Sequence, residues 1–203
     1  MRQLLRIPAV YASFGNFVTG NGRFLDVYVR KHIRAEAGDK ILDIGCGPGS
    51  ILNVLPENCV YTGFDISDSY IAAAQKHYGN RASFFHSGVN ENLIGSLPGH
   101  DLVIATGVLH HLSDELAQLL LRIAWSNLRP GGRLVTSDGC FTQDQPWLNR
   151  LVVGMDRGEY VRPAPCYQEL AHAHFSKVEL SVYHDLLRIP YSHAIMECRR
   201  EEA

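Results

Sequence analysis

The chain has 203 residues, 46% of them hydrophobic, and a formal net charge of −2. This length suffices for one domain with a full apolar core, and the near-neutral charge gives no reason to expect a nucleic-acid or anionic-membrane surface. The five cysteines are scattered and never spaced C-x-x-C, which favours neither disulfides nor a zinc site and is typical of reduced thiols in a cytoplasmic protein. No apolar stretch approaches the ~18 residues of a membrane span, and the interrupted N-terminal segment is too short for a signal peptide.

Residues 1–37 are predicted to form N-terminal cap helices. Apolar residues recur with helical spacing from Asn21 to Ala37, which indicates a helix there. The arm before it contains Tyr11 and Phe14, which either pack against the fold or act as a lid over a ligand. Packing is the interpretation that we favour.

The most informative stretch is residues 40–49, which read K-I-L-D-I-G-C-G-P-G. The apolar run predicts a buried strand that carries Asp43 near its end. The strand must stop at the alternating glycines, because glycine weakens a strand and supplies the conformations of a tight turn. Residues 50–55 resemble the first turns of a helix. Such a strand, turn and helix N-terminus let a ligand approach bare backbone at the carboxyl end of a parallel sheet, which predicts a nucleotide-type site.

Two kinds of site use such a turn. A dinucleotide site has G-x-G-x-x-G or its alanine variant, but the third small position here is Ser50, and Asp43 would lie beside a diphosphate. The residues fit D-x-G-x-G-x-G better and resemble the first motif of class I S-adenosylmethionine-dependent methyltransferases. The resemblance implies that Asp43 helps to hold the methionine part of the cofactor, largely through its ammonium. The turn residues expected against the cofactor are Gly45, Cys46, Gly47 and Gly49.

A second strand is predicted over residues 59–64 and delivers Asp65, 20 residues after Gly45. A carboxylate there can accept hydrogen bonds from both hydroxyls of a ribose. G-F-D-I-S-D-S-Y-I resembles the second methyltransferase motif, which assigns Asp65 to the ribose and Ile66 to the adenine ring. The alternative role for Asp65 is an N-cap for the helix predicted over 67–78.

The third strand, residues 82–87, leads into G-V-N-E-N-L. Related methyltransferases commonly have an aspartate here that accepts a hydrogen bond from the adenine amino group. That place falls at Gly88, so the chain departs from the family pattern. The backbone around Gly88 and Val89, or the side chain of Asn90, is expected to replace the contact.

The fourth strand, residues 102–105, opens into T-G-V-L-H-H-L-S-D-E, which begins with Thr106. It resembles the loop that closes over the methyl end of the cofactor. His110 or His111 is a candidate general base for an acceptor hydroxyl, since imidazole titrates near working pH. The alternative is that both histidines only pack and hydrogen-bond. The chain lacks N/D-P-P-F/Y, the tetrapeptide of many base and amide N-methyltransferases, which argues against those substrates.

A helix is predicted to begin at Ser113, with acidic residues in its first turn. The sequence R-P-G-G at 129–132 ends it and starts a fifth strand, a further segment typical of these methyltransferases. Asp138 lies where that strand ends, at the ligand-binding side of an open α/β sheet, and would either orient an acceptor or cap the next segment.

Residues 141–167 are predicted to form an insertion that contains a helix near Trp147 and a charged loop. In small-molecule methyltransferases such an insertion builds the acceptor pocket. The candidate substrate residues are Arg157, Tyr160 and Arg162, whose guanidinium groups suit a carboxylate or phosphate. The alternative is a solvated loop with internal salt bridges.

A helix over 168–174 and two antiparallel strands, 177–184 and 191–199, complete the predicted sheet. His172, His174, His184 and His193 show no metal-ligand spacing, and we predict no metal site.

These elements predict one α/β domain over residues 1–203, a three-layer Rossmann-like sandwich with a seven-stranded, mostly parallel sheet and a terminal antiparallel strand. The resemblance implies transfer of a methyl group from S-adenosyl-L-methionine, with S-adenosyl-L-homocysteine as product, to a small-molecule or glycan-precursor acceptor. Oxygen is the favoured acceptor atom. The alternatives are a nicotinamide-dependent oxidoreductase and a non-catalytic S-adenosylmethionine-binding module.

Overall fold

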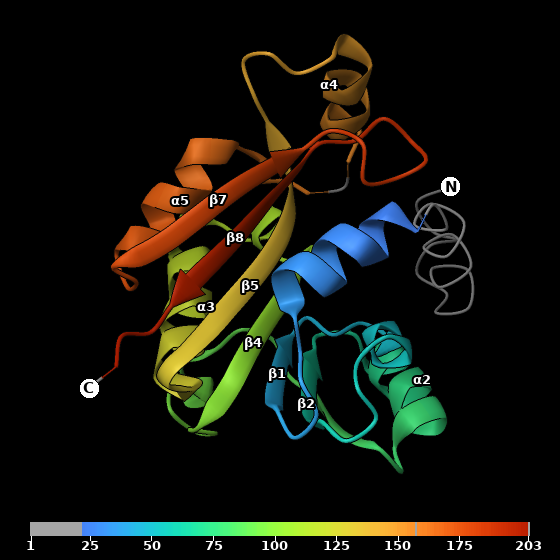
Figure 1. Cartoon of the computed structure of the whole chain (residues 1–203), viewed down its shortest axis with the longest axis vertical. Helices are drawn as coiled ribbons and strands as arrows, with labels where there is room; N and C mark the ends of the chain where they lie inside the picture. The colour runs from blue at the N-terminus through green and yellow to red at the C-terminus, as the bar shows by residue number, and fades with distance from the viewer. Residues whose placement is uncertain (1–21, 157, 203) are drawn as a thin grey trace.

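Strands and helices alternate along the chain and assemble into a central sheet with helices on both faces (Figure 1). The computed structural model describes residues 22–156 and 158–202. The strands are β1 (Lys40–Ile44), β2 (Val60–Asp65), β3 (Ala82–His86), β4 (His100–Thr106), β5 (Leu128–Phe141), β6 (Arg162–Pro163), β7 (Lys177–Tyr183) and β8 (His193–Arg199). The α-helices are α2 (Asp68–Tyr78), α3 (Asp114–Asn127), α4 (Trp147–Gly154) and α5 (Ala164–His172). The shorter or differently wound helices are η2 (Leu25–Ile33), η3 (Ser50–Asn53), η4 (Glu91–Leu93) and η5 (Leu109–His111).

The strand order is β3-β2-β1-β4-β5-β8-β7, with β6 paired to the end of β5. Strands β1 to β5 run parallel to their neighbours, whereas β8 runs antiparallel to both β5 and β7. This arrangement confirms the predicted Rossmann-like sheet. Because β1, β2 and β4 are parallel neighbours, the residues that follow them meet at one edge of the sheet.

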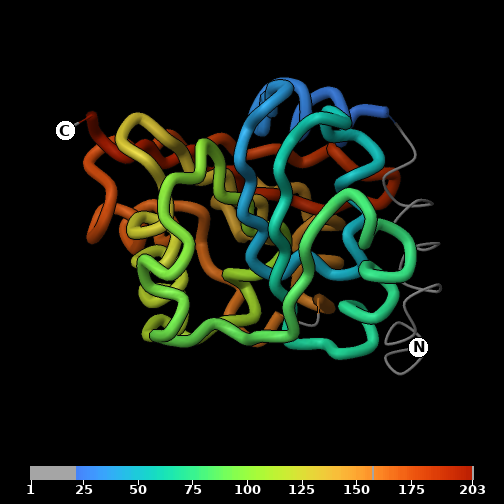
Figure 2. Tube along the Cα trace, turned by 90° about the horizontal axis from the view of Figure 1, so that it is seen from below, coloured from blue at the N-terminus to red at the C-terminus, as the bar shows by residue number. Residues whose placement is uncertain are grey.

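Both faces of the sheet are covered, as expected for parallel strands. Along β1, Leu42 and Ile44 face a core shared with α3 and α5, whereas Ile41 faces a second core shared with η2, η3 and α2. Figure 2 shows η2 and α3 on opposite sides of the sheet. Within the described ranges, no helix combines the length and the apolar character that a membrane crossing demands.

The helix predicted to follow the glycine turn is only one 3-10 turn, η3. Pro56 lies close behind it and disfavours a helical conformation for Leu55, which explains the early end. Arg81 supplies hydrogen-bond donors to the backbone carbonyls at this end of the helix. Its guanidinium donates to the carbonyls of Leu52, Leu55 and Pro56.

Two other helices also differ from their predicted bounds. The N-terminal helix occupies Leu25–Ile33 and is wound as a π-helix. Residues 1–21, with Tyr11 and Phe14, lie outside the described residues. Helix α5 begins at Ala164 directly after Pro163, four residues before its predicted start at Gln168. Proline is favourable at a helix start, because its missing N–H is not needed there.

The cap of α3 was predicted correctly. The backbone N–H of Leu116 donates to Ser113 Oγ at 3.5 Å, and Asp114 and Glu115 lie in the first helical turn. The R-P-G-G segment after α3 is already paired into the sheet as part of β5, with an irregular register between the pairs His100–Leu128 and Leu102–Arg133.

Truncating a core residue of α3 should destabilise the fold. Leu120 is fully buried, whereas Leu116 on the same helix is 41% exposed. We expect Leu120→Ala to lower the free energy of unfolding by about 2–5 kcal/mol, because it leaves a cavity in the core. Leu116→Ala is the matched control and should change it by less than about 1 kcal/mol. Urea unfolding followed by circular dichroism measures both, and equal losses would contradict this packing.

Candidate functional site

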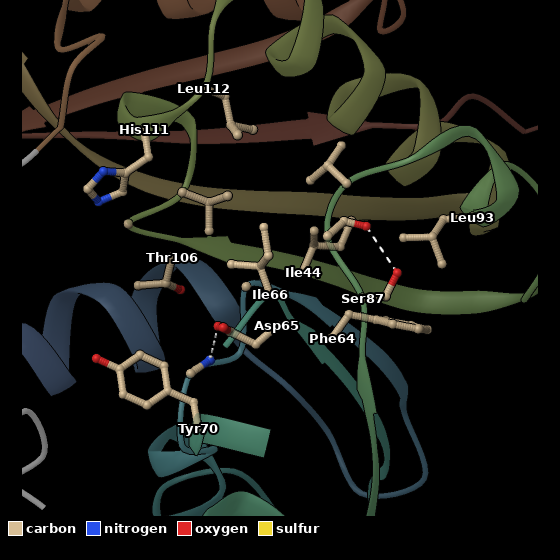
Figure 3. A pocket seen from close by; sticks show the side chains of 16 residues that line it. Ile44, Phe64, Asp65, Ile66, Tyr70, Ser87, Leu93, Thr106, His111 and Leu112 are labelled. Carbon is tan, nitrogen blue, oxygen red and sulfur yellow. Dashed lines mark hydrogen bonds between the residues drawn. The ribbon is translucent and has the colours of Figure 1, made fainter. Parts of the chain in front are cut away.

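A cleft of about 410 Å³ opens at the carboxyl ends of β1, β2 and β4, a size that suits a small-molecule cofactor (Figure 3). The residues that line it are Ile44, Gly45, Gly47, Phe64, Asp65, Ile66, Tyr70, Ser87, Gly88, Val89, Leu93, Thr106, Gly107, Val108, His111 and Leu112. The cleft therefore lies at the edge of the sheet where the sequence places its motifs.

The glycine turn presents bare backbone to this cleft. The N–H groups of Gly45 and Cys46 both donate to the Phe64 carbonyl, which ties the turn to β2. Gly45 has a φ of +80°, and a Cβ there would lie 2.5 Å from Val108 Cγ2. Gly47 has a φ of +54° and open space where a Cβ would stand. A ligand can thus approach Gly47 along a path that a side chain would obstruct.

The other two predicted turn contacts lie away from the open space. The Cys46 side chain is buried against Gly63, where an added Cβ would come within 2.8 Å of Cys46 Sγ. It can meet a ligand only through its backbone. Gly49, with a φ of +75°, packs beside the rings of Phe84 and Tyr78. Its structural role is to let the chain turn into η3.

Asp43 is a buried carboxylate with one oxygen unpaired. It is 4% exposed, and the Tyr61 hydroxyl donates to its Oδ2 at 2.6 Å. Its Oδ1 has no hydrogen-bond partner among the described residues. Burial raises the pKa of Asp43 to about 7; the Tyr61 hydrogen bond opposes this and nearby Asp65 adds to it. Asp43 is therefore poised to accept a cationic partner.

Asp65 connects the turn to the second strand. Its Oδ2 accepts the N–H of Gly47 at 2.9 Å and its Oδ1 accepts the N–H of Ser67 at 2.8 Å. The cap of α2 is Ser67, which accepts the N–H of Tyr70, so the N-cap alternative for Asp65 was wrong. Each carboxylate oxygen keeps a further lone pair, and Asp65 lines the cleft.

The wall beyond Asp65 is apolar and flat enough for a planar ring. Ile66 is 77% exposed and lies over Gly88, where an added Cβ would meet its Cδ1 at 3.4 Å. Gly88 and Val89 both line the cleft. Asn90 does not, because its amide donates to Ser87 Oγ and the Gly88 carbonyl while its Oδ1 caps η4. Two groups were expected to contact the adenine in place of the aspartate that this chain lacks. Of these, Gly88 and Val89 line the cleft and the Asn90 side chain does not.

The two histidines of the β4–α3 loop occupy different environments. His111 is exposed and lines the cleft, whereas His110 is buried behind it. His110 Nδ1 hydrogen-bonds Asp138 Oδ1 at 2.9 Å, and its Nε2 lies 3.4 Å from Asp156 Oδ1. Burial lowers the pKa of His110, but the two carboxylates outweigh it and raise that pKa to about 9. Sequence analysis could not separate the two histidines; the structure does.

The predicted acceptor residues do not gather in the cleft. Asp138 is buried under His110. Arg162 is 8% exposed and donates to Asp114 and to the carbonyls of Leu109, Leu112 and Tyr160, which agrees with the internal salt-bridge alternative. Tyr160 is 42% exposed beside it. Arg157 lies outside the described residues.

Comparison with known proteins decides the family. A family model described as a methyltransferase domain matches residues 42–134. A ubiquinone biosynthesis O-methyltransferase from Nitrosospira multiformis is 32% identical over 110 residues, which cover 52% of this chain and 44% of the relative. A juvenile hormone acid O-methyltransferase from Bombyx mori is 32% identical over 100 residues, 46% of this chain and 36% of the relative.

Among solved structures, human N-acetylserotonin methyltransferase in complex with S-adenosylmethionine shares the fold, with a TM-score of 0.66 at 20% identity. It is matched over 98% of this chain and 58% of that chain. Residues 42–134 are therefore a methyltransferase domain, and the fold is that of the class I S-adenosylmethionine-dependent methyltransferases. It spans less than half the length of the two curated relatives it matches.

Family membership implies S-adenosylmethionine as the cofactor, and the residues of the cleft fit it. Asp43 is buried in β1 and does not line the cleft, but its unpaired Oδ1 suits the ammonium of the methionine part. Gly47 does line the cleft and leaves room for a ligand beside its backbone. Asp65 would accept from the ribose hydroxyls, and Ile66 would cover the adenine. Thr106, whose hydroxyl hydrogen-bonds Tyr28 Oη at 2.6 Å, lines the same cleft.

Several lining residues of this methyltransferase were not predicted. Tyr70 reaches the cleft from the first turn of α2, and Leu93 and Leu112 close it from the loops after β3 and β4. Tyr28 braces Thr106 from η2, 78 residues away in sequence. Of these residues, only Tyr70 could have been predicted from the sequence, because it lies in the helix that begins just after Asp65.

The state of Asp43 should make cofactor affinity depend on pH. The ammonium prefers ionised Asp43, and the pKa of Asp43 is raised to about 7, so affinity should increase as pH rises through that value. We expect the Kd of S-adenosylhomocysteine to fall roughly tenfold between pH 6 and pH 8, from the ionised fraction of such a group. Calorimetry measures this, and Asp43→Asn should bind weakly with a flat profile. A wild-type profile as flat as that of the variant would contradict it.

Loss of the Asp65 carboxylate should weaken cofactor binding if it holds the ribose. We expect Asp65→Ala to reduce S-adenosylhomocysteine affinity by about 2–4 kcal/mol, because two charge-assisted hydrogen bonds are lost. Asp68→Ala is the matched control, since Asp68 is exposed in the next helix. Calorimetry on variants with unchanged circular dichroism spectra measures the difference, and full affinity in a folded Asp65→Ala protein would overturn the assignment.

Proposed function

We propose that this protein transfers the methyl group of S-adenosylmethionine to an oxygen atom of a small-molecule or glycan-precursor acceptor. Two kinds of observation support oxygen. The matched curated relatives from Nitrosospira multiformis and Bombyx mori are both named O-methyltransferases. The chain also lacks the N/D-P-P-F/Y tetrapeptide that grips planar nitrogen in many N-methyltransferases.

The observation that carries the proposal is the position of His111. It lines the same cleft as Gly47 and Asp65, at the end formed by the β4–α3 loop, with Thr106 and Leu112 beside it. A ligand held by the glycine turn and Asp65 extends along the cleft toward this loop (Figure 3). An acceptor that enters from the loop side would meet an imidazole, a group that accepts or donates protons near neutral pH.

The bound cofactor supplies an activated methyl group on a cationic sulfur. That methyl group would pass to an acceptor oxygen, and the His111 imidazole would take the hydroxyl proton. Asp43 and the turn fix one end of the donor, and Asp65 fixes its sugar. Holding donor and acceptor in reacting geometry can supply most of the acceleration, equivalent to effective molarities on the order of 10⁵ M or more.

Buried polar contacts hold the loop that carries His111. Arg162 donates to the carbonyls of Leu109 and Leu112 on either side of the histidines, and it pairs with Asp114 at the start of α3. Because its donors are occupied by protein groups, we assign Arg162 to positioning of the loop rather than to substrate binding. Asp138 has the same function beneath His110.

Transfer of a labelled methyl group tests the proposal. The protein is incubated with methyl-labelled S-adenosylmethionine and a panel of phenols, sugars, carboxylic acids and amines of similar size. We expect label in products that mild base or mass fragmentation identifies as ethers or esters. Label in amines alone would refute oxygen transfer, and cofactor binding without label in any class would favour the non-catalytic alternative.

Removal of the His111 imidazole should slow turnover without weakening cofactor binding. We expect His111→Ala to lower kcat by about 10²-fold or more, the usual contribution of a general base, with unchanged affinity for S-adenosylhomocysteine. His172→Ala is the control, because His172 is exposed on α5 and does not line the cleft. Steady-state assays measure both, and equal kcat values for the two variants would remove His111 from the chemistry.

A further inference from the structure

Three side chains with metal-binding atoms converge beside the cleft. His110 and His111 come from η5, and Asp156 comes from the loop after α4. One donor atom from each lies within 4.8 Å of the other two. The two imidazole rings are stacked at a tilt, with their centroids 4.2 Å apart. The predicted absence of a metal site considered four other histidines and did not consider this group.

The spacing between His110 and Asp156 is unusual for a hydrogen bond. The distance from Nε2 to Oδ1 is 3.4 Å, beyond the ordinary range for an N–H···O contact. Two ligands bound to one tetrahedral zinc ion at about 2.1 Å are separated by about 3.4 Å. The 3.4 Å gap that now holds an ion pair is therefore also wide enough for a shared cation.

The atoms behind these ligands are arranged as in metal sites. His110 Nδ1, the ring nitrogen on the far side, hydrogen-bonds Asp138 Oδ1 at 2.9 Å, which fixes the ring with Nε2 toward Asp156. The Asp156 carboxylate is itself held by Tyr191, whose hydroxyl donates to Oδ2 at 2.7 Å, and by the N–H of Gly158. A carboxylate behind a ligating imidazole and hydrogen bonds to a ligating carboxylate are the usual supports of a bound cation.

We propose that His110, His111 and Asp156 bind one divalent cation of the zinc type at the acceptor end of the cleft. Two imidazoles and one carboxylate suit zinc rather than magnesium, which prefers oxygen ligands alone. Three protein ligands leave one tetrahedral position for a fourth, oxygen-bearing ligand, as in catalytic zinc sites. His111 lines the cleft whereas His110 is buried behind it, so the cation would lie at the wall of the cleft.

The role of the cation rests on the proposed function. An acceptor hydroxyl in the fourth position would lose its proton to solvent more readily, because the cation would stabilise the alkoxide or phenolate. His111 would then be a ligand of the cation, and the turnover lost in His111→Ala would follow from loss of the cation. The cation also replaces the proton between His110 and Asp156, so binding releases a proton to solvent.

The test measures metal binding directly. Tag-free protein stripped with a chelator is titrated calorimetrically with ZnCl₂, and with CoCl₂ under visible absorption. We expect one equivalent of zinc to bind, and a cobalt spectrum without the sulfur-to-metal charge-transfer band of a thiolate. The last point excludes binding at the partly exposed Cys166.

Variants localise the site. Asp156→Asn and His111→Gln should each weaken zinc binding at least tenfold, while His172→Gln, on the exposed face of α5, should leave it unchanged. Substitutions at buried His110 are avoided because they would strand the buried Asp138 carboxylate. Retained S-adenosylhomocysteine binding shows that the other variants are folded. Zinc binding that is absent from the wild type, or equal in all three variants, overturns the proposal.

The same preparation separates this inference from the proposed function. Methyl transfer by chelated protein at the full rate, together with no zinc binding, refutes the cation site and leaves the methyltransferase assignment intact. Zinc binding that depends on His111 and Asp156, in a protein that methylates no acceptor, supports the cation site and refutes the proposed oxygen transfer.

Discussion

The site depends on one buried carboxylate, that of Asp43, which has one oxygen without a hydrogen-bond partner among the described residues. Asp43 lies within β1 between two covered sheet faces, and Tyr61 satisfies only its Oδ2. An unpaired charge in such a place is unfavourable, so the residue favours the neutral form until a cation arrives. The buried carboxylate therefore favours a positively charged ligand. The negative diphosphate of a dinucleotide would be unfavourable beside it.

On the acceptor side, by contrast, the buried charged side chains have oppositely charged partners in the protein. Arg162 is surrounded by Asp114 and three backbone carbonyls, and His110 lies between Asp138 and Asp156. Both groups hold the β4–α3 loop, which must keep its shape if His111 is to face the cleft. Breaking such a buried pair is strongly unfavourable, because it strands the remaining charge. Asp43 therefore keeps one oxygen without a partner among the described residues, whereas Arg162 and His110 each have carboxylate partners in the protein.

The features that could be predicted from the sequence are those that neighbouring residues in the chain determine. The glycine turn, Asp65 and the Ser113 cap follow from residues adjacent in the chain, and the strand order follows from the family resemblance. The roles of Arg162 and His110 could not be predicted, because their partners lie 48 and 28 residues away. Likewise, no pattern shows which of two neighbouring histidines in a 3-10 turn faces solvent. Asn90 was misplaced for a similar reason: its side chain has nearby backbone partners in its own loop.

The place of β8 has a consequence for how the molecule assembles during synthesis. This strand lies between β5 and β7, although it is translated after both. Until residues 193–199 leave the ribosome, the exposed flank of β5 has no permanent neighbour, and β7 cannot join the sheet. Strand β8 therefore completes the described sheet, and a nascent chain halted before it would present an unpaired backbone ladder suited to chaperone binding or to aggregation.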